Sequence, residues 1–323
     1  MPSYIGRGAA VGAGEETVWG TAVSRTHWAQ VISSKLERSV GKVLRPNLGL
    51  TGVPARRRHF ISEDMAGGDI EMEMLLEGQG IWLKHALGTV ADAGGGDPYT
   101  HTYTQSSQLD AGVGLTIEQI LGVDADAGGT RSEVFEGCKI NTLGISCGLG
   151  DIMKMKLGII AETSATRGAG GSPTFTTNDY PVLFNHAGAF AWNSVSYSNV
   201  KSFDLAHDNK LGSRQRFGAT TTKEPVRMDF SETKIRLTMD LVSDALLTAF
   251  TADTASDLTV TYTNAANRTI LFTLTNAYIS AYSDGTSGPG LLEASIEFTG
   301  QYDGTTNPLK ITITNSQATG ILA

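Results

Sequence analysis

The chain repeats one strand–turn–strand pattern, and this constrains its fold more than any other feature. Residues 138–160 read CKINTLGISCGLGDIMKMKLGII, residues 277–299 read AYISAYSDGTSGPGLLEASIEFT, and the two segments align without a gap. Met155 and Leu157 fall on Ala294 and Ile296, with polar residues or glycine between them. Alternation with a period of two indicates a strand with one buried face, and a Gly-rich turn between two such runs indicates a β-hairpin. The sequence therefore predicts two copies of one β unit.

Two further blocks repeat upstream of these hairpins. The segment GGDIEMEMLLEGQGIWLKHALG (67–88) matches ETKIRLTMDLVSDALLTAFTAD (232–253), with Ile70 on Ile235, and each copy reads as a strand that runs into a helix. Residues 31–47 resemble residues 200–218, and each copy reads as a strand followed by a long loop. We expect these loops at 45–69 and 211–231.

The repeats predict a division of the chain into two tandem units. Gly, Ser and Thr are frequent in the segment between them, which is typical of a linker. The expected parts are an N-terminal arm (1–29), a first unit (30–165), a linker (166–197), a second unit (198–310) and a C-terminal tail (311–323).

Composition and charge support a β-rich protein and argue against a nucleic-acid binder. The chain has 38 Gly, and Thr, Ser and Asn are spread along its whole length, whereas a helical bundle would show long runs of Ala, Glu, Lys and Leu. The net charge is −8, and phosphate binding requires clustered Lys and Arg. An acidic protein suits a surface past which DNA moves without sticking.

The cysteines and the ends of the chain indicate a protein made in a reducing compartment. Cys138 and Cys147 are separated by an odd number of positions, which predicts opposite faces of one strand, and we expect two buried, reduced thiols. We expect no signal peptide and no membrane span, because the N-terminus lacks an apolar core and no apolar run is long enough.

One motif suggests a hydrolase, but its context argues against catalysis. Gly144-Ile145-Ser146-Cys147-Gly148 fits the G-x-S-x-G pattern of a nucleophile elbow, which requires a strand, a sharp turn and then a helix. Here a strand-like segment follows, and the second copy has no equivalent serine. We expect no catalytic residue and treat a serine hydrolase using Ser146 as a remote alternative.

No cofactor or metal site is expected. The histidines form neither H-x-H nor H-E-x-x-H, and the nearest approach to a metal cluster is Asp204, His207 and Asp208. We interpret this segment as a polar turn before NKLG.

The one basic cluster is ARRRHF (55–60), which lies in the long loop of the first unit. Two interpretations remain open for Arg56, Arg57 and Arg58: a solvated loop, or a contact with an acidic surface of a neighbouring copy. DNA binding ranks below both, because a nucleic-acid site needs more basic area and more aromatic residues.

Four segments together carry a resemblance to a known family. They are GEETVWGTAV (14–23), the strand–helix block at 67–88, NVKSFDLAHDNKL (199–211) and LLEASIEFTGQYDG (291–304). In pattern and block order the chain resembles phage tail tube proteins of the roughly 300-residue type from long-tailed bacteriophages.

The resemblance implies a fold and a function. Each unit would be a small β-sandwich or half-barrel with one flanking α-helix, and ring assembly would close the sheets into an inner β-barrel. Stacked rings would form the tail tube, a conduit for DNA ejection into the host, and DNA would pass without specific binding. Because each chain carries two units, a homotrimeric, pseudo-hexameric ring is favoured over a ring of six chains.

The resemblance also implies partners and a location. The chain would contact itself and other tail proteins, would be assembled in the bacterial host cytoplasm and would remain in the virion tail. The alternative is another non-enzymatic virion component, such as a minor tail, baseplate-hub or capsid-decoration protein.

Overall fold

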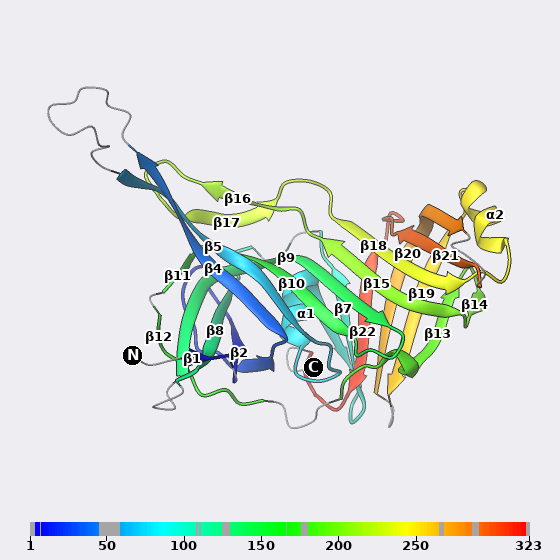
Figure 1. Cartoon of the computed structure of the whole chain (residues 1–323), viewed down its shortest axis with the longest axis horizontal. Helices are drawn as coiled ribbons and strands as arrows, with labels where there is room; N and C mark the ends of the chain where they lie inside the picture. The colour runs from blue at the N-terminus through cyan, green and yellow to red at the C-terminus, as the bar shows by residue number, and fades with distance from the viewer. Residues whose placement is uncertain are drawn as a thin grey trace.

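The computed structural model describes residues 4–6, 8–44, 59–107, 109, 111–124, 130–165, 167–175, 180–264, 268–285 and 291–320. Strands account for most of these residues, and the described part holds two short α-helices, α1 (Gly80–Leu87) and α2 (Ala245–Thr251) (Figure 1). The prediction of a mainly β fold is confirmed.

One long antiparallel sheet runs through the molecule. Its strands are hydrogen-bonded neighbours in the order β4, β5, β10, β9, β15, β18, β21, β20. Their bounds are β4 Ser33–Leu44, β5 His59–Glu73, β9 Thr130–Gly148, β10 Lys154–Ala161, β15 Val200–Asp208, β18 Glu232–Asp240, β20 Arg268–Gly285 and β21 Glu293–Thr299. Both predicted closing hairpins, β9–β10 and β20–β21, are confirmed.

The first four strands of this order and the last four share one cross-strand register. One row of opposed residues crosses each set: Leu36, Gly68, Ile159 and Ile140 in the first, and Leu205, Ile235, Phe298 and Ile279 in the second. The register shifts by one residue at equivalent places, after Ile140 in β9 and after Ile279 in β20. A β-bulge at the same place in both hairpins indicates that the two hairpins have equivalent backbone structures.

The structure corrects one alignment made from the sequence. The match of 67–88 with 232–253 placed Ile70 on Ile235, but the register places Gly68 on Ile235 and Ile70 on Leu237. A shift of two residues preserves the alternation of a strand, so hydrophobic periodicity alone does not reveal it.

A second layer of strands covers the buried face of each half. β9 also pairs with β8, followed by β2 and β3; β20 pairs in the same way with β19, followed by β13 and β14. These strands are β2 Ala10–Glu15, β3 His27–Gln30, β8 Leu115–Asp124, β13 Ala187–Trp192, β14 Val195–Tyr197 and β19 Ala255–Asn264. Large side chains such as Phe135, Phe203 and Phe298 fill the core between the layers.

The segments expected to be an arm, a linker and a tail all contribute strands. β2 lies between β8 and β3, β13 pairs with β19, and β22 (Leu309–Asn315) lies between β20 and β7 (Tyr99–Gln105). The segment expected to be an N-terminal arm is therefore part of the sheets. Glu15 fixes β2 to α1 through Lys84 (2.7 Å) and His85 (3.4 Å). His85, with Lys84, lowers the pKa of Glu15 to about 2 despite partial burial.

The predicted long loops are partly strands. β4 and β5 form a two-stranded arm that extends from the body, and residues 45–58 lie outside the described part (Figure 1). At the corresponding place in the second half, β16 (Leu211–Gln215) and β17 (Thr222–Arg227) form a hairpin of their own. Most residues of both segments are exposed, and their polar and apolar residues do not alternate in the way that marks a half-buried strand.

Additional short elements lie around the sheets. They are β1 Tyr4–Ile5, β6 Gly88–Ala93, β11 Thr163–Ser164, β12 Gly168–Ala169 and the 3₁₀ turn Phe184–His186. β6 pairs with β7, and both belong to the first half only.

The two cysteines are free and buried, as expected, but the expectation of opposite faces is wrong. The register shift between Ile140 and Thr142 restores the phase of β9, so that Leu143 and Cys147 point into the same core as Cys138.

Candidate functional site

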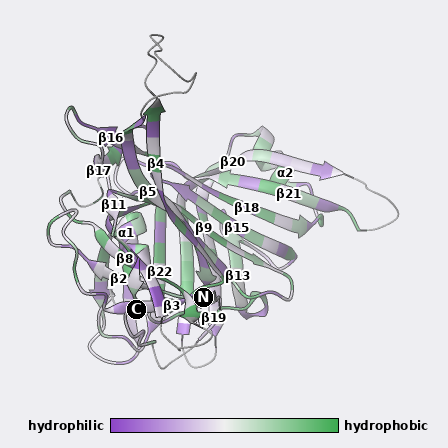
Figure 2. Cartoon of the chain, turned by 60° about the vertical axis from the view of Figure 1, so that its left-hand side comes forward, coloured by the Kyte–Doolittle hydropathy of each residue, from purple (hydrophilic) through white to green (hydrophobic). Residues whose placement is uncertain are grey.

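The exposed face of the long sheet is polar. Along strands such as β18 and β21, buried apolar residues alternate with more exposed polar ones. Figure 2 shows the corresponding alternation of hydrophobic and hydrophilic residues along the ribbon. On β10, for example, Met155 and Leu157 are fully buried, whereas Lys154 and Lys156 point away from the core.

Ion pairs neutralise several cations of this polar face. Lys156 lies 2.9 Å from Asp69 on the neighbouring β5, and Arg236 lies 3.0 Å from Glu297 on the neighbouring β21. Lys201 contacts both Asp240 and Glu293 at 2.5 Å. A strand face whose cations are paired with carboxylates offers little net attraction to phosphate.

Glu297 is the centre of the largest of these groups. Its carboxylate contacts Lys234 at 3.5 Å as well as Arg236, and Ser280 donates a hydrogen bond to it at 3.2 Å. Partial burial raises the pKa of Glu297, but Lys234, Ser280 and Arg236 outweigh this and lower it overall. The carboxylate is therefore ionised at neutral pH.

The two outermost strands of the sheet each have an edge that pairs with no strand in the described part of the chain. β4 pairs with β5 alone, and the second half of β20, from Ile279 to Gly285, pairs with β21 alone. β4 and β20 lie toward opposite ends of the long axis (Figure 1). An unpaired strand edge presents backbone donors and acceptors to another chain.

The edge of β4 is partly satisfied by a side chain. The backbone N–H of Leu36 points away from β5 and donates to the side-chain oxygen of Gln119 in β8 at 3.1 Å. Sequence analysis did not identify Gln119, because a polar residue inside a strand gives no sign of its partner.

The basic cluster of the arm lies outside the described residues, so the structure does not place Arg56, Arg57 or Arg58. The arm itself begins with an ion pair at its base. Both oxygens of Asp64 in β5 accept hydrogen bonds from the Arg38 guanidinium in β4, and this contact holds the pKa of Asp64 below its usual range.

Ser146 lies within β9, between Asp204 of β15 and Lys154 of β10. No helix follows it, since the chain continues through a turn into β10. The strand–turn–helix geometry of a nucleophile elbow is therefore lacking at this serine.

Asp204, His207 and Asp208 do not converge. They lie within β15, which corrects the expectation of a turn, and alternation sends His207 into the core, away from the two aspartates. The His207 ring contacts Thr233 Oγ1 at 2.8 Å and Asn209 Oδ1 at 3.2 Å, and burial lowers its pKa to about 4. No group of three potential metal ligands occurs among the described residues.

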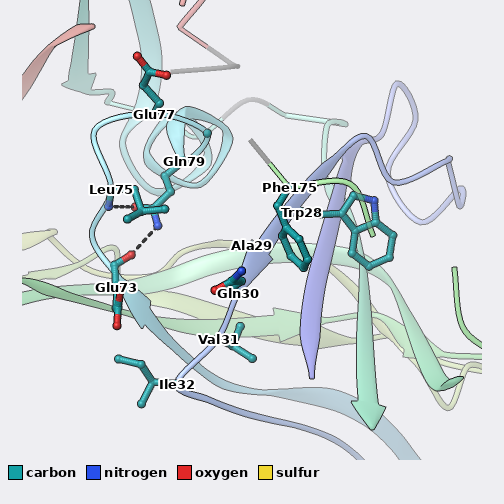
Figure 3. Close-up of a pocket in the computed structure, with 11 residues that line it drawn as sticks. Trp28, Ala29, Gln30, Val31, Ile32, Glu73, Leu75, Glu77, Gln79 and Phe175 are labelled. Atoms are coloured by element: carbon teal, nitrogen blue, oxygen red, sulfur yellow. Dashed lines mark hydrogen bonds between the residues drawn. The ribbon is translucent and has the colours of Figure 1, made fainter. Parts of the chain in front are cut away.

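A cleft lies between the β3–β4 connection and the segment before α1 (Figure 3). Gln79 closes the loop at its wall, because its side chain accepts from Leu75 N–H at 3.0 Å and donates to the Glu73 carbonyl at 2.5 Å. A second cleft lies at the corresponding place in the other half, lined by residues 195–199 and 239–243. The two clefts follow from the repeated topology.

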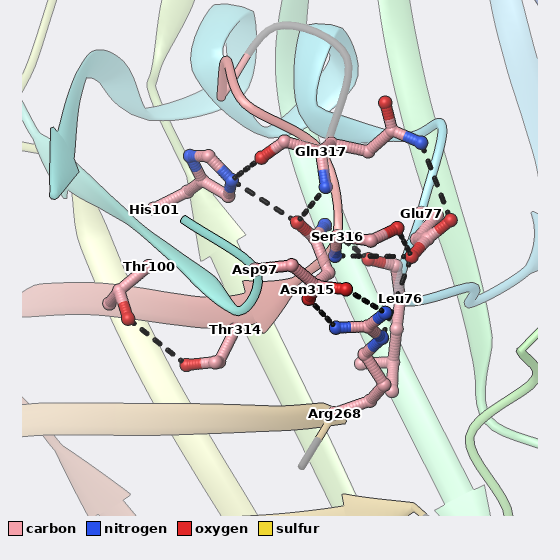
Figure 4. Close-up of polar contacts among 10 residues, drawn as sticks. All are labelled: Leu76, Glu77, Asp97, Thr100, His101, Arg268, Thr314, Asn315, Ser316 and Gln317. Atoms are coloured by element: carbon pink, nitrogen blue, oxygen red, sulfur yellow. Dashed lines mark hydrogen bonds and ion pairs between the residues drawn. The ribbon is translucent and has the colours of Figure 1, made fainter. Parts of the chain in front are cut away.

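A buried polar network joins the C-terminal strand to the first half (Figure 4). Glu77 is fully buried, accepts hydrogen bonds from Ser316 N–H (3.2 Å) and Gln317 Nε2 (3.3 Å), and lies 3.6 Å from Arg268 Nε of β20. Arg268 also pairs with Asp97 at 2.6 Å. The network fastens β20 and the residues after β22 to the loops of the first half.

Within the described residues, no helix combines the length and apolar character needed to span a bilayer.

Among the residues that the structure describes, a polar sheet face and two unpaired strand edges are the distinguishing features, and such edges can pair with another chain. A family model described as phage tail tube protein matches residues 6–300. The chain belongs to this family and is a structural component of the phage tail. Comparison with curated proteins gives no match.

Proposed function

We propose that the chain self-assembles into rings that stack to form the tail tube, and that three chains make one ring with pseudo-sixfold symmetry. The observation that carries this proposal is the repeated strand order, β4-β5-β10-β9 followed by β15-β18-β21-β20, with an unpaired edge at each end. A head-to-tail contact between such edges is heterologous and closes into a ring when the rotation permits.

In this proposal the two units are wider than the sequence suggested. The first runs from β2 to β10 and the second from β13 to β21, so that the two units contain equivalent second-layer strands. β6, β7 and β22 are additions that brace the first unit against the second.

The polar face of the long sheet would line the lumen. Closing the edges turns the sheet into a barrel, and the buried face is already covered by the second layer and the helices. Paired cations on the lumen side would allow DNA to pass without specific binding during ejection. The arm formed by β4 and β5, and the β16–β17 hairpin, would reach the next ring. Assembly in the host cytoplasm and contacts with other tail proteins at the tube ends complete the proposal.

Negative-stain electron microscopy of the concentrated protein tests this function. Hollow tubes or stacked rings are the expected result. Closed particles without an axial hole would instead favour another virion role, such as a capsid-decoration or baseplate-hub protein.

A further inference from the structure

We infer that the interface between two copies pairs β20 of one with β4 of the next in one defined register, with Ser283 opposite Glu37 of the second copy. This inference rests on the proposed ring assembly and names its contact. It is argued from the junction between β9 and β15, which the chain already contains.

The internal junction is a complete example of the contact. β15 lies antiparallel to β9, with Asp204 opposite Ser146, Ala206 opposite Gly144 and Asp208 opposite Thr142. Asn209 N–H, just beyond β15, donates to the Asn141 carbonyl at 2.8 Å. Alternate residues of β15 thus direct their backbone groups toward β9.

β20 matches β9 in its pairing with a second-layer strand and with a hairpin partner, but not on the remaining edge of its second half. Each strand pairs with a second-layer strand over its first half and with its hairpin partner over its second half, and each carries the register shift at the same place. β9 then receives β15 on its remaining edge, and no strand in the described part occupies that edge of β20.

β4 is equivalent to β15, because each begins its half of the sheet. The shared row of opposed residues places Leu36 on Leu205, and therefore Glu37 on Ala206. The same row places Tyr282 on Leu143, and therefore Ser283 on Gly144. Transferring the pair Ala206–Gly144 to the outer edges gives the pair Glu37–Ser283 between copies.

The backbone N–H of Leu36 also points away from β5, toward the unpaired edge of β4. In the equivalent strand Leu205 lies opposite Ile145, and Val260, which stands at the position of Gln119, offers no acceptor. Gln119 therefore serves as a substitute acceptor for Leu36 in the separate chain. In the assembled ring, the carbonyl of Asp284 of the second copy would take its place.

Side-chain packing near the two edges supports the same partner. α1 is covered, with Trp82, Leu83 and Leu87 fully buried, and Asn209 after β15 donates to the Ala86 carbonyl at its C-terminal end. α2 buries only Leu246.

The corresponding surfaces of the outer edges are apolar and exposed. Val242 before α2 and Phe250 within it remain exposed, and the arm formed by β4 and β5 exposes Val43 and Ile61. The internal junction shows how an arm reaches such a site, because Glu224 of β17 pairs with Lys139 of β9 at 2.9 Å. A second copy's arm would cover the α2 side in the same way.

Disulfide trapping of the full-length protein tests the register. Glu37 and Ser283 are exposed on the same face and would form a non-hydrogen-bonded pair, the closely spaced kind in an antiparallel ladder. The double variant Glu37→Cys/Ser283→Cys, oxidised after assembly, should give covalent dimers and closed trimers on non-reducing gels. The native thiols are buried.

Matched variants make the outcome specific. Glu37→Cys/Ala281→Cys, two residues out of register, should give roughly tenfold less product, because disulfide geometry tolerates little separation. Gly144→Cys/Ala206→Cys should close a bond within one chain and leave the apparent mass unchanged. Dimers from Glu37→Cys alone would mean that β4 pairs with β4 and would overturn the inference.

Electron microscopy of the same samples tests ring assembly separately from the register of the contact. Rings or tubes without cross-linking in the double variant would refute the register and leave the ring intact. Failure of the wild-type protein to form rings or tubes in any condition would refute the proposed function, and the inference with it.

Discussion

Ile145 of β9 lies directly opposite Leu205 of β15, so the main sheet continues without a break from the first half of the chain into the second. Both side chains are fully buried. Because the halves share one strand order and one register, this pair shows how a unit accepts the next unit at its edge.

Gly68 should be intolerant of a side chain, whereas Gly144 should accept one. A Cβ at Gly68 would lie 2.0 Å from the Lys35 carbonyl oxygen, and its φ of +144° disfavours other residues. A Cβ at Gly144 would meet its nearest neighbour at 3.8 Å. Gly68→Ala should lower the free energy of unfolding by about 1–3 kcal/mol, and Gly144→Ala should change it little. Equal losses in urea titrations of the two variants would contradict the close approach of β4 to β5.

His207 should make the protein less stable in acid. Its folded pKa of about 4 lies below the usual 6.5 because of burial. Above pH 6.5 both states are neutral and His207 contributes no pH dependence; as the pH falls toward 4, the unfolded state takes up a proton that the folded state refuses. Between pH 7 and 4.5 this should cost about 2–3 kcal/mol of stability.

The comparison with His207→Gln isolates this effect from that of the carboxylates. The variant is expected to be less stable at pH 7 but to lose less stability on acidification than the wild type. Chemical denaturation at the two pH values gives the difference, and identical losses in the two proteins would rule out a buried neutral His207.

Removing Glu77 should release the C-terminal segment. Glu77→Ala leaves the buried side of Arg268 without its carboxylate and removes the acceptor of Ser316 and Gln317, so we expect a loss of about 3 kcal/mol. Amide hydrogen exchange should accelerate in β22 before it does in β10. Glu77→Gln, which keeps an acceptor of similar size, should be milder. Unchanged exchange in β22 would show that the network does not fasten this strand.

Gln119→Met should weaken the separate chain without blocking assembly. The change leaves the Leu36 amide without an acceptor, which costs about 1–3 kcal/mol in a buried site. Assembly would restore a partner from the next copy, so ring formation should survive. A variant that is destabilised and also unable to form rings would contradict the role of Gln119 as a substitute acceptor.

Neutralising the carboxylates of the polar face should make it bind DNA. Asp69→Asn and Glu297→Gln together would unpair Lys156 and Arg236. Assembled tubes of this variant should retain DNA at low salt and release it as salt rises, because binding to phosphate releases counterions. Conversion of two exposed carboxylates outside the strands of the long sheet, Asp253→Asn and Asp303→Asn, is the control. Equal DNA retention by the two variants would argue that the polar face does not line the lumen.

Sequence patterns revealed the elements that have one buried and one exposed face. The alternation of Met155 and Leu157 with lysines, and its echo at Ala294 and Ile296, gave both hairpins correctly. The sequence alignment at Ile70 was wrong by two residues, because a shift of two residues leaves the alternation of a strand unchanged.

Strands that lack a contrast between a buried apolar face and an exposed polar face were not predicted from the sequence. β2 reads AVGAGE, in which small residues replace alternation, and Gly12 is required there because a Cβ would lie 2.8 Å from the Trp28 ring. The hairpin β16–β17 is largely exposed and lacks a regular alternation of polar and apolar residues, so it resembled a loop. The sequence predicted an acidic surface past which DNA moves. It did not predict the unpaired edges of β4 and β20, because these depend on the order of the strands in the sheet, which no local pattern encodes.

Cryo-electron microscopy of assembled tubes, averaged without imposed symmetry, tests the central claim most directly. The account predicts three chains per ring, seen as six similar densities that alternate between a unit carrying α1, β6 and β7 and a unit carrying α2. A ring of six chains, with each chain contributing one repeat of the wall, would contradict it.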